Sequence, residues 1–398
     1  MALHPQTPSR GPGNPACINP KQIHLLQINV NGLRSKIEEL RLYVEETSPD
    51  VILISETKLN NNPTPLIPNY LTAATRDRQN EHTGGGGVAI YIRNNIDFSN
   101  ISPDIDDMAA IEIKLNNNQK IGILCFYRHP MAPLLDQYTY LEEISKNYRH
   151  LIIGGDLNAK HQFYGSKSTN RAGDSLFNLC EQLDLTVGNN PDEPTFISSL
   201  TNTKDIIDYW LMSAKISKRH YRSWTGDDVG SDHLPLHLSI DLQTQPLKHE
   251  KKAVRMWKNC RWDEYTQEIA NTMNLHETAP LLSTTDIETE CQVLTDILTT
   301  AIDNVCPKKT IRDQAFRLST ETVQKIRNKR KVRRKMQKDN NPALKEIFNH
   351  LKKQIAAAIK EEKRRAWENA TKELNDTKGR DFWKKIQNIN WPKQGTTK

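Results

Sequence analysis

Apolar and polar residues alternate along this chain in two different rhythms. Between residues 22 and 242, short apolar runs such as Leu151–Ile153 have the length and composition of buried β-strands. Amphipathic stretches lie between these runs, and strands that alternate with helices are typical of a layered α/β domain. The clearest predicted helix spans residues 33–47, and its apolar face consists of Leu33, Ile37, Leu40 and Val44. We therefore predict one α/β domain over residues 22–242.

The segments on either side of this domain have other patterns. Residues 1–21 contain several Pro and Gly and little periodicity, which predicts a flexible leader. Residues 243–310 read as a connector with some helix, in which Trp257 and Trp262 are expected to dock on a neighbouring surface.

A helical hairpin is predicted over residues 311–375. Ser319 or Thr320 caps a first helix that runs to Lys338, where the Asp-Asn-Asn-Pro sequence ends it. The second helix needs a partner for its apolar stripe, and the preceding helix is the simplest one. This stripe consists of Leu344, Phe348, Leu351, Ile355 and Ile359. Residues 376–398 are then the start of a linker.

Polar side chains follow the predicted strands at the points where the strands end. Asp156 and Asn158 come directly after the apolar run and two glycines, and Glu56 follows the run that begins at Val51. Asp208 stands inside an apolar run, where a buried carboxylate without a partner is costly, and His233 precedes another strand. In α/β proteins, functional side chains gather at the carboxyl ends of the strands. The sequence therefore predicts one site built from several strands.

The order and wording of these blocks resemble the endonuclease/exonuclease/phosphatase superfamily, and within it the apurinic-type endonuclease domain of jockey-like non-LTR retrotransposons. The matching blocks are N-x-N-G-L at Asn29–Leu33, S-E-T-K at Ser55–Lys58, G-G-G-V-A-I at Gly85–Ile90, G-D-L-N at Gly155–Asn158, I-D-Y at Ile207–Tyr209 and S-D-H-L-P at Ser231–Pro235. The resemblance implies a four-layer α/β sandwich, with two packed β-sheets flanked by helices. In full-length relatives a reverse transcriptase domain follows, and we expect this chain to be truncated before it.

The resemblance also implies catalytic roles. Asp156 is expected to activate the attacking water, with Asn158 orienting that water and Asn29 holding the carboxylate. His233 is expected to donate to a phosphate oxygen, and Asp208 to orient the imidazole and favour its charge. This last pairing agrees with elementary electrostatics, because a carboxylate on one ring nitrogen raises the pKa of a histidine.

A divalent cation is the implied cofactor. Glu56 is the principal expected ligand, with Asn31 and Asp232 as additional or water-mediated ligands for Mg²⁺, or Mn²⁺ as an alternative. Tyr127 matches the family tyrosine near the scissile phosphate, although an isolated tyrosine is more often a core aromatic. The chain departs from the cellular apurinic endonucleases at Asn31, where those enzymes have an acid, and in the Arg-His-Pro segment after Tyr127.

Charge is distributed unevenly along the chain. The net charge is +7, but residues 308–373 alone contain 21 Lys and Arg against 8 Asp and Glu, so the remainder is acidic. This predicts contact of the helical hairpin with nucleic acid, either double-stranded DNA or element RNA, or else with an import receptor. The candidate contact residues on the hairpin are Lys329, Arg330, Lys331, Arg333 and Arg334. Candidate DNA-facing residues in the loops of the α/β domain are Asn170, Arg171, Thr195 and Phe196.

Composition bears on the location of the protein and on its partners. No apolar run of about 18 residues is present and the N-terminus lacks a signal-peptide pattern, so we expect no membrane partner. The six cysteines form no Cys-x-x-Cys pair and are expected to be reduced thiols. The expected location is the nucleus during integration and otherwise the cytoplasm. The sequence does not indicate an oligomeric state.

These observations favour a Mg²⁺-dependent endonuclease that nicks DNA and leaves a 3′-hydroxyl for target-primed reverse transcription. The alternatives are a cellular apurinic-site repair endonuclease, a phosphoesterase acting on inositol lipids or small phosphates, and a catalytically inactive nucleic-acid-binding fragment. Because every candidate catalytic group lies within residues 22–242, we also expect this span to nick DNA without the rest of the chain.

Overall fold

The structure, a computed structural model, describes most of the chain. The described residues are 22–60, 62–78, 85–115, 119–132, 135–198, 203–242, 244, 253–274, 284–310, 316–339 and 341–375. The leader predicted at 1–21 and the linker predicted at 376–398 lie outside them. The chain forms two compact units, one of Met1–Leu247 with Ala315–Lys398 and one of Lys248–Gln314.

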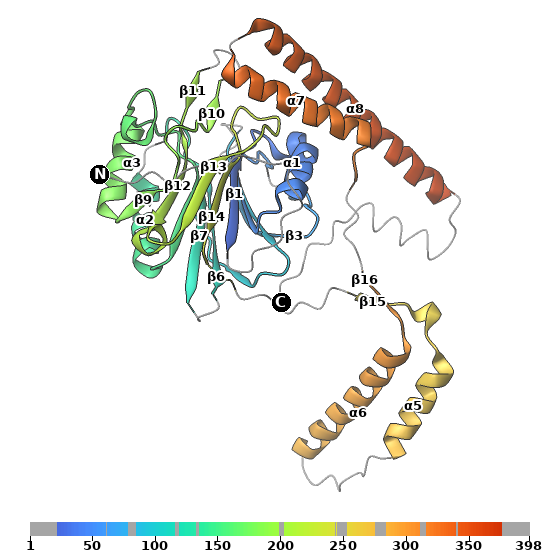
Figure 1. Cartoon of the computed structure of the whole chain (residues 1–398). Coiled ribbons are helices and arrows are strands. Elements are labelled where there is room, and N and C mark those ends of the chain that lie inside the picture. The colour runs from blue at the N-terminus through green and yellow to red at the C-terminus, as the bar shows by residue number, and fades with distance from the viewer. Residues whose placement is uncertain are drawn as a thin grey trace. The chain divides into compact units, whose positions relative to one another are not determined.

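The first sheet of the larger unit has six strands (Figure 1). These are β1 (Ile23–Asn29), β2 (Val51–Ser55), β3 (Tyr70–Arg76), β4 (Val88–Arg93), β13 (Tyr221–Thr225) and β14 (Leu236–Ile240). They lie in the order β13-β14-β1-β2-β4-β3. β1 and β2 are parallel and the other neighbours are antiparallel, so the carboxyl ends of β1 and β2 lie at the same edge.

The second sheet also has six strands. These are β5 (Phe98–Asn100), β6 (Met108–Lys114), β7 (Lys120–Phe126), β8 (Leu151–Asp156), β9 (Leu185–Val187) and β12 (Asp208–Ser213). They lie in the order β5-β6-β7-β8-β12-β9, with β7 and β8 parallel and the other neighbours antiparallel. A separate two-stranded pair is formed by β10 (Phe196–Ile197) and β11 (Lys204–Asp205).

The sheets pack face to face and helices cover their outer faces. The core between the sheets includes Leu53, Ile123 and Trp210. Helix α1 (Leu33–Thr47) packs on the first sheet, and α2 (Leu135–Asn147) and α3 (Arg171–Gln182) pack on the second. The remaining short helices of this domain are η1 (Gln162–Tyr164) and α4 (Ala214–Ser217). This arrangement confirms the prediction of a four-layer α/β sandwich, and α1 has the predicted bounds.

Two glycines near the end of β8 let neighbouring segments approach closely. A Cβ on Gly154 would lie 2.3 Å from the ring of Trp210 and 2.7 Å from Leu53, so this position lets the two sheets pack tightly. A Cβ on Gly155 would lie 1.7 Å from the carbonyl oxygen of Phe126. The Gly-Gly sequence is therefore a packing requirement of the strand that delivers Asp156.

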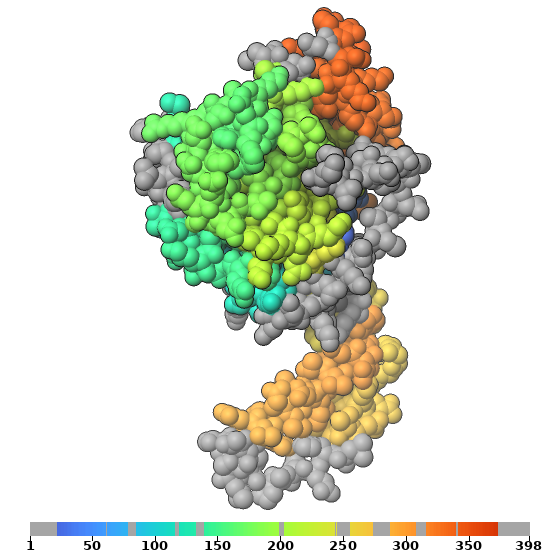
Figure 2. Space-filling view, turned by 60° about the vertical axis from the view of Figure 1, so that its left-hand side comes forward, coloured from blue at the N-terminus to red at the C-terminus, as the bar shows by residue number. Residues whose placement is uncertain are grey.

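Residues 316–375 contain the predicted helical hairpin. It consists of α7 (Thr320–Lys338) and α8 (Pro342–Asn375). The hydroxyl of Ser319 accepts a hydrogen bond from the backbone N–H of Thr322 at 3.2 Å and so caps α7. Figure 2 shows the hairpin, in orange, lying on the surface of the α/β domain.

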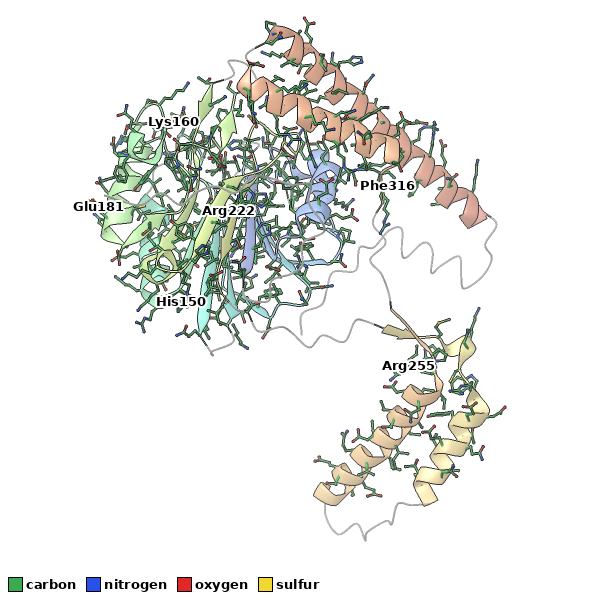
Figure 3. The ribbon with its side chains drawn as sticks, viewed as in Figure 1. His150, Lys160, Glu181, Arg222, Arg255 and Phe316 are labelled. Carbon is green, nitrogen blue, oxygen red and sulfur yellow. The ribbon has the colours of Figure 1, made fainter. Side chains whose placement is uncertain are left out.

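The smaller unit is a helical pair with a short two-stranded ribbon. Its elements are β15 (Ala253–Arg255), η2 (Trp257–Asn259), α5 (Trp262–Asn274), α6 (Thr284–Val305) and β16 (Lys308–Thr310). Arg255, which is labelled in Figure 3, forms an ion pair with Asp303 of α6. Trp257 and Trp262 stack on each other with ring centres 6.1 Å apart, and both remain about half exposed.

None of the described helices combines the length and apolar character needed to cross a membrane. The described cysteines are free thiols, and most of them are buried; they are Cys125, Cys180, Cys260, Cys291 and Cys306. The sixth, Cys17, lies outside the described residues.

A buried histidine pair joins β1 to β14 and makes the stability of the fold depend on pH. His24 Nε2 lies 2.9 Å from His237 Nδ1, and the hydroxyl of Tyr43 lies 2.6 Å from His237 Nε2. Burial lowers the pKa of His24 to about 4, with a further contribution from Arg93. Burial and the neighbouring His24 lower the pKa of His237 to about 3.

We expect the free energy of unfolding to decrease as the pH falls. Unfolded histidines bind protons below about pH 6.5, whereas this folded pair stays neutral until about pH 4, so stability is fully present above pH 6.5 and is lost below it. Between about pH 7 and pH 5 the loss should be on the order of 2 kcal/mol per histidine. Urea titrations at several pH values measure this. A His24→Gln variant should show a shallower pH dependence, and an equal dependence would contradict the assignment.

Candidate active site

The candidate site lies at one edge of the two packed sheets, where four strands bring their ends together. Asn29 ends β1 opposite Ser55 of β2, so Glu56 comes directly after that pair. On the other sheet, Asp156 ends β8 and is the cross-strand partner of Asp208, the first residue of β12. The topology thus brings together side chains from the ends of several strands, as the sequence predicted.

Asn29 joins the two sheets at this edge. Its side-chain amide donates to Glu56 Oε1 at 2.9 Å and to Asp156 Oδ2 at 2.8 Å. Its side-chain oxygen accepts from the backbone N–H of Asn31 at 2.9 Å. Because an amide donates to both carboxylates, it holds two negative groups near each other without neutralising either one.

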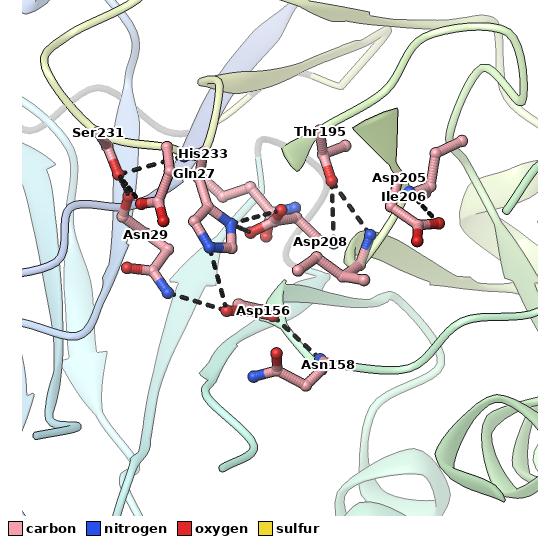
Figure 4. A network of polar contacts seen from close by, with 12 residues as sticks. Gln27, Asn29, Asp156, Asn158, Thr195, Asp205, Ile206, Asp208, Ser231 and His233 are labelled. Atoms are coloured by element: carbon pink, nitrogen blue, oxygen red, sulfur yellow. Dashed lines mark hydrogen bonds and ion pairs between the residues drawn. The ribbon is translucent and has the colours of Figure 1, made fainter. Parts of the chain in front are cut away.

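His233 lies between two buried carboxylates (Figure 4). Its Nδ1 donates to Asp208 at 2.9 Å, and its Nε2 lies 3.7 Å from Asp156 Oδ2, beyond hydrogen-bond distance. Both ring nitrogens therefore face carboxylate oxygens, which suits an imidazolium more than a metal ligand. Of the described His, Cys, Asp and Glu side chains, these three group closely enough to hold an ion by themselves.

The pKa values follow from this arrangement. Burial opposes the charge on His233, but Asp208 and then Asp156 outweigh it and raise the pKa of His233 to about 10. Burial raises the pKa of Asp156 above its ordinary value, and the nearby Asp208 carboxylate adds to this effect. The imidazole is therefore charged at neutral pH, and Asp156 is a stronger base than an exposed aspartate.

Oxygen atoms that suit a hard cation converge beside Asn29. Burial disfavours ionisation of Glu56, but hydrogen bonds from Asn29 and Lys58 lower its pKa, so it is a carboxylate. Lys58 Nζ lies 2.6 Å from Asn31 Oδ1 and 3.1 Å from Glu56 Oε2, so both oxygens already face one cationic group. Asp232 is half-buried, and its Oδ1 accepts from the hydroxyl of Ser231 at 3.3 Å.

Three of the candidate residues have left-handed backbone conformations. The φ angles are 46° at Asn31, 50° at Glu56 and 48° at Asn158. Asparagine tolerates this region, whereas glutamate carries a Cβ penalty of about 1–2 kcal/mol. Such strain persists only where the surrounding structure enforces it, and it is often found at functional sites.

The segment after β7 packs beneath the site. Tyr127 is buried, its hydroxyl hydrogen bonds to Glu56, and the Arg78 guanidinium lies 5.6 Å from its ring centre. The side chain of Asn158 donates to the backbone carbonyl of Arg128 at 2.8 Å, and Arg128 itself is buried and donates to neighbouring carbonyls. Arg128, at which the chain departs from the family pattern, therefore stabilises the segment after β7 through its hydrogen bonds.

The structure corrects the prediction that Thr195 faces nucleic acid. Thr195 is fully buried, and its hydroxyl accepts hydrogen bonds from the backbone N–H groups of Ile207 and Asp208 at 3.2 and 3.1 Å. It positions Asp208 instead. Its neighbour Phe196 is half-buried and packs edge to face on the ring of His233, with ring centres 5.0 Å apart.

Several residues at the site were not assigned roles from the sequence. Lys58 was quoted within the S-E-T-K block, yet only the structure places its ammonium between Glu56 and Asn31. The hydroxyl of Ser231 donates to the carbonyl of Asn29 at 2.7 Å and so ties the His233 loop to β1. The sequence offered one indication for each residue, which is its position: Lys58 ends the S-E-T-K block and Ser231 begins the S-D-H-L-P block.

The loop candidates Asn170 and Arg171 lie at the start of α3. Asn170 caps the helix, because its side-chain oxygen accepts from the backbone N–H of Gly173 at 2.8 Å. The same oxygen accepts from the backbone N–H of Lys160 at 2.9 Å. Arg171 is exposed, so of the two it is the side chain open to a partner.

The structure also corrects three of the five nucleic-acid candidates on α7. Lys329, Arg330 and Arg333 are buried, with 0%, 4% and 5% of their surface exposed, and they contact the α/β domain. The dense basic run was predicted to contact nucleic acid or an import receptor, but one side of this helix packs against acidic residues. Lys331 and Arg334 remain exposed.

A cavity of about 850 Å³ lies away from this site. It is lined by residues around the amino end of β8, among them Lys120, His150 and Arg219, whereas Asp156 ends the same strand. Burial and nearby cations, Arg219 first, lower the pKa of His150. The catalytic candidates therefore do not line this cavity.

The residues of this site lie in a part of the chain that matches a known protein family. Residues 26–233, more than half of the chain, match the Endonuclease/Exonuclease/phosphatase family. The chain belongs to this family. The matched span contains every catalytic and metal-binding candidate named above, from Asn29 to His233.

Among curated proteins, this family member is similar to RNA-directed DNA polymerases from the mobile element jockey. That of Drosophila melanogaster is 24% identical over 336 residues, covering 81% of this chain and 35% of the relative. That of Drosophila funebris is 23% identical over 359 residues, covering 87% and 38%. The chain thus spans little more than a third of the length of these relatives.

Solved structures with a similar fold include two nucleases. The endonuclease domain of TRAS1, a telomere-specific non-LTR retrotransposon, is 21% identical with a TM-score of 0.47, covering 56% of this chain and 99% of that one. The apurinic endonuclease of Leishmania major is 15% identical with a TM-score of 0.44, covering 56% of this chain and 88% of that one.

Proposed function

We propose that this member of the family is a Mg²⁺-dependent DNA endonuclease of a non-LTR retrotransposon. It nicks one strand and leaves a 3′-hydroxyl that primes reverse transcription of element RNA. The observation that carries the proposal is the chain of polar contacts Asp208–His233–Asp156–Asn29–Glu56, which crosses both sheets at one edge. The similarity to RNA-directed DNA polymerases of mobile elements supports the retrotransposon origin.

The donor set suits a small hard cation. Glu56 and Asn31 present oxygen atoms that already share one positively charged partner, and Mg²⁺ prefers carboxylate and amide oxygens. Glu56 would hold the ion, with Asn31 and Asp232 as further or water-mediated ligands, and Mn²⁺ is the alternative ion. When bound, a divalent cation supplies positive charge to a phosphodiester as negative charge develops on it.

The chain's own residues supply the remaining chemistry. Asp156 accepts a proton from the attacking water, because burial raises its pKa toward neutrality. The charged His233, held by Asp208, donates to a non-bridging phosphate oxygen. Asn29 keeps the Asp156 carboxylate in place, Asn158 orients the water, and Tyr127 lies next to Glu56 at the same edge.

Nucleic-acid contact is assigned to side chains that are exposed or half-buried. Phe196 beside His233, the loop around Asn170 and Arg171, and the exposed α7 residues Lys331 and Arg334 are the proposed contacts with double-stranded DNA or element RNA. Action on chromosomal DNA implies nuclear localisation during integration and cytoplasmic localisation otherwise.

Metal removal tests the proposal directly. Excess EDTA should abolish nicking of supercoiled plasmid by the full chain, and added Mg²⁺ should restore it, because charge on the phosphate needs a cation to stabilise it. Gel electrophoresis of the nicked circle measures the rate, with Asp156→Asn protein purified in parallel as the control for contaminating nuclease. Full activity in EDTA would remove the metal from the proposal.

Substrate comparison separates the competing functions. The retrotransposon endonuclease should nick intact duplex, whereas a repair enzyme should require an abasic site in the same duplex. Turnover of a small phosphoester without nicking would indicate the phosphoesterase alternative. Binding without any cleavage, in Mg²⁺ and in Mn²⁺, would indicate a catalytically inactive nucleic-acid-binding fragment.

A further inference from the structure

The basic helix α7 packs on two segments that border the catalytic residue His233. One of them is the loop 226–232, which leads from β13 to His233, and the other is β10, which contacts His233. From the α/β domain, Glu39 and Glu46 of α1 and Asp227 and Asp228 of the loop form ion pairs with α7. From α8, Glu362 accepts hydrogen bonds from Ser319 and Thr322 at the start of the helix.

Lys329 is the centre of the first contact. Its ammonium is fully buried and lies 2.5 Å from Glu39 Oε2 and 3.0 Å from Asp228 Oδ2. The Asp228 carboxylate is itself buried, and Lys329 is the cation that faces it. Arg330 extends the contact, because its Nε donates to the backbone carbonyl of Asp228 at 3.2 Å and its guanidinium lies over the ring of Tyr43.

The loop held by Lys329 runs directly into the catalytic residues. After Asp228, Val229 is buried in the core beneath α1. The hydroxyl of Ser231 then donates to the carbonyl of Asn29 at 2.7 Å and accepts from the backbone N–H of His233 at 3.3 Å. Asp228 is therefore an anchor five residues before the imidazole, and the intervening residues are fixed by packing and hydrogen bonds.

Arg333 supports the other side of the same imidazole. Its guanidinium donates to the carbonyl of Ile197 at 3.3 Å and lies over the ring of Phe348 in α8. The N–H of Ile197 in turn donates to the carbonyl of Asp232 at 2.9 Å. The neighbouring Phe196 packs on His233, so the strand braced by Arg333 borders the catalytic ring.

We propose that α7 is a positioning element of the active site, in which Lys329 and Arg333 hold the His233 loop and β10 in register with Asp208 and Asp156. Helix α7 thus has two faces with different roles. Its buried face holds the His233 loop and β10, so residues 22–242 alone should nick DNA more slowly than the full chain, and its exposed face is left for nucleic acid. The role in turnover rests on the proposed endonuclease function, whereas the effect on the order of the loop does not.

Lys329→Met in the full chain tests this role. The substitution leaves Asp228 and Glu39 without a buried cation, so the loop should become mobile and the kcat for plasmid nicking should fall about tenfold or more, because a displacement of about 1 Å at a catalytic group can cost about a hundredfold in rate. The KM for DNA should change little. Hydrogen–deuterium exchange of residues 226–234 and 195–198 should increase in the same protein.

Two further variants keep the test decisive. Arg333→Met leaves no buried carboxylate unpaired, so it should fold normally and still lower kcat and raise exchange at 195–198. Asp228→Asn combined with Lys329→Met should recover part of the lost kcat, because one unpaired buried charge is removed. Lys325→Met, one turn earlier on the same helix and paired with the exposed Glu321, is the matched control and should change neither measurement.

The outcomes separate this proposal from the others. Unchanged kcat and unchanged exchange in both single variants would overturn it. A rise in the KM for DNA alone, with kcat and exchange intact, would also overturn it and return α7 to a purely nucleic-acid-binding role. If the wild-type chain nicks no DNA, the proposed function fails, while the exchange measurement still decides whether α7 orders the His233 loop.

Discussion

Replacing Asp156 with alanine should lower the rate of plasmid nicking by about 10²- to 10⁴-fold, the usual contribution of a general base. The carboxylate ends β8 beside His233, and burial raises its pKa, so its removal takes away the group best placed to accept a proton from water. Initial rates at saturating DNA measure the effect.

The same variant should remain folded. Burial opposes the ionisation of this carboxylate, so its loss removes an unfavourable buried charge, but it also leaves the Asn29 amide and the Asn158 backbone N–H without this acceptor, and circular dichroism should be used to confirm the fold. Asp156→Asn serves as the matched control, because it preserves the volume and the contact with Asn29 and should be nearly as inactive. Nicking by folded Asp156→Ala at a rate close to that of the wild type would remove Asp156 from the catalytic role.

His233→Ala should lower nicking by about 10²- to 10³-fold, as expected when one charged donor to a transition state is lost. Its Nδ1 is held by Asp208 at 2.9 Å, and the carboxylates keep the ring charged, so the wild-type donor is available throughout the neutral range. Plasmid nicking and DNA affinity should be measured on the same preparations. Affinity should change little, because Phe196 and the exposed cations remain.

Asp208→Asn provides the comparison that separates charge from geometry. The amide keeps the size of the side chain and a hydrogen-bonding oxygen, but it cannot supply the negative charge that favours the imidazolium. This variant should therefore bind DNA normally and turn over slowly, with a smaller loss than His233→Ala. If it matches the wild type in rate, Asp208 is structural and the charge on His233 has another origin.

The fold was largely predictable, because the patterns that encode it are local. Hydrophobic periodicity predicts the helix over 33–47 and the strand before Asp156. Turn residues mark the break near Pro342 between two helices. The catalytic candidates could be named because each lies in or next to a predicted strand and because the ordered blocks that contain them resemble a known family. The contact distances between Asp156, Asp208 and His233 depend on strand register, which the pattern of one strand does not contain.

What the sequence did not reveal are the contacts between distant segments. Lys329 lies 290 residues from Glu39, and nothing in the local run of Lys and Arg distinguishes a residue that faces an acidic helix from one that faces solvent. Thr195 was misread for a similar reason, since a threonine in a polar loop gives no sign that its hydroxyl holds the backbone of Asp208. The sequence did not show which charged and polar side chains are buried.

The left-handed backbone at Glu56 limits which substitutions the site can accept. This conformation is strained for any residue that has a Cβ, so among substitutions only glycine relieves it, and a replacement of Glu56 by alanine keeps the strain while it removes the carboxylate that Asn29 and Lys58 contact. The fold alone would favour glycine at this position, so the chain carries the carboxylate of Glu56 at a cost in stability.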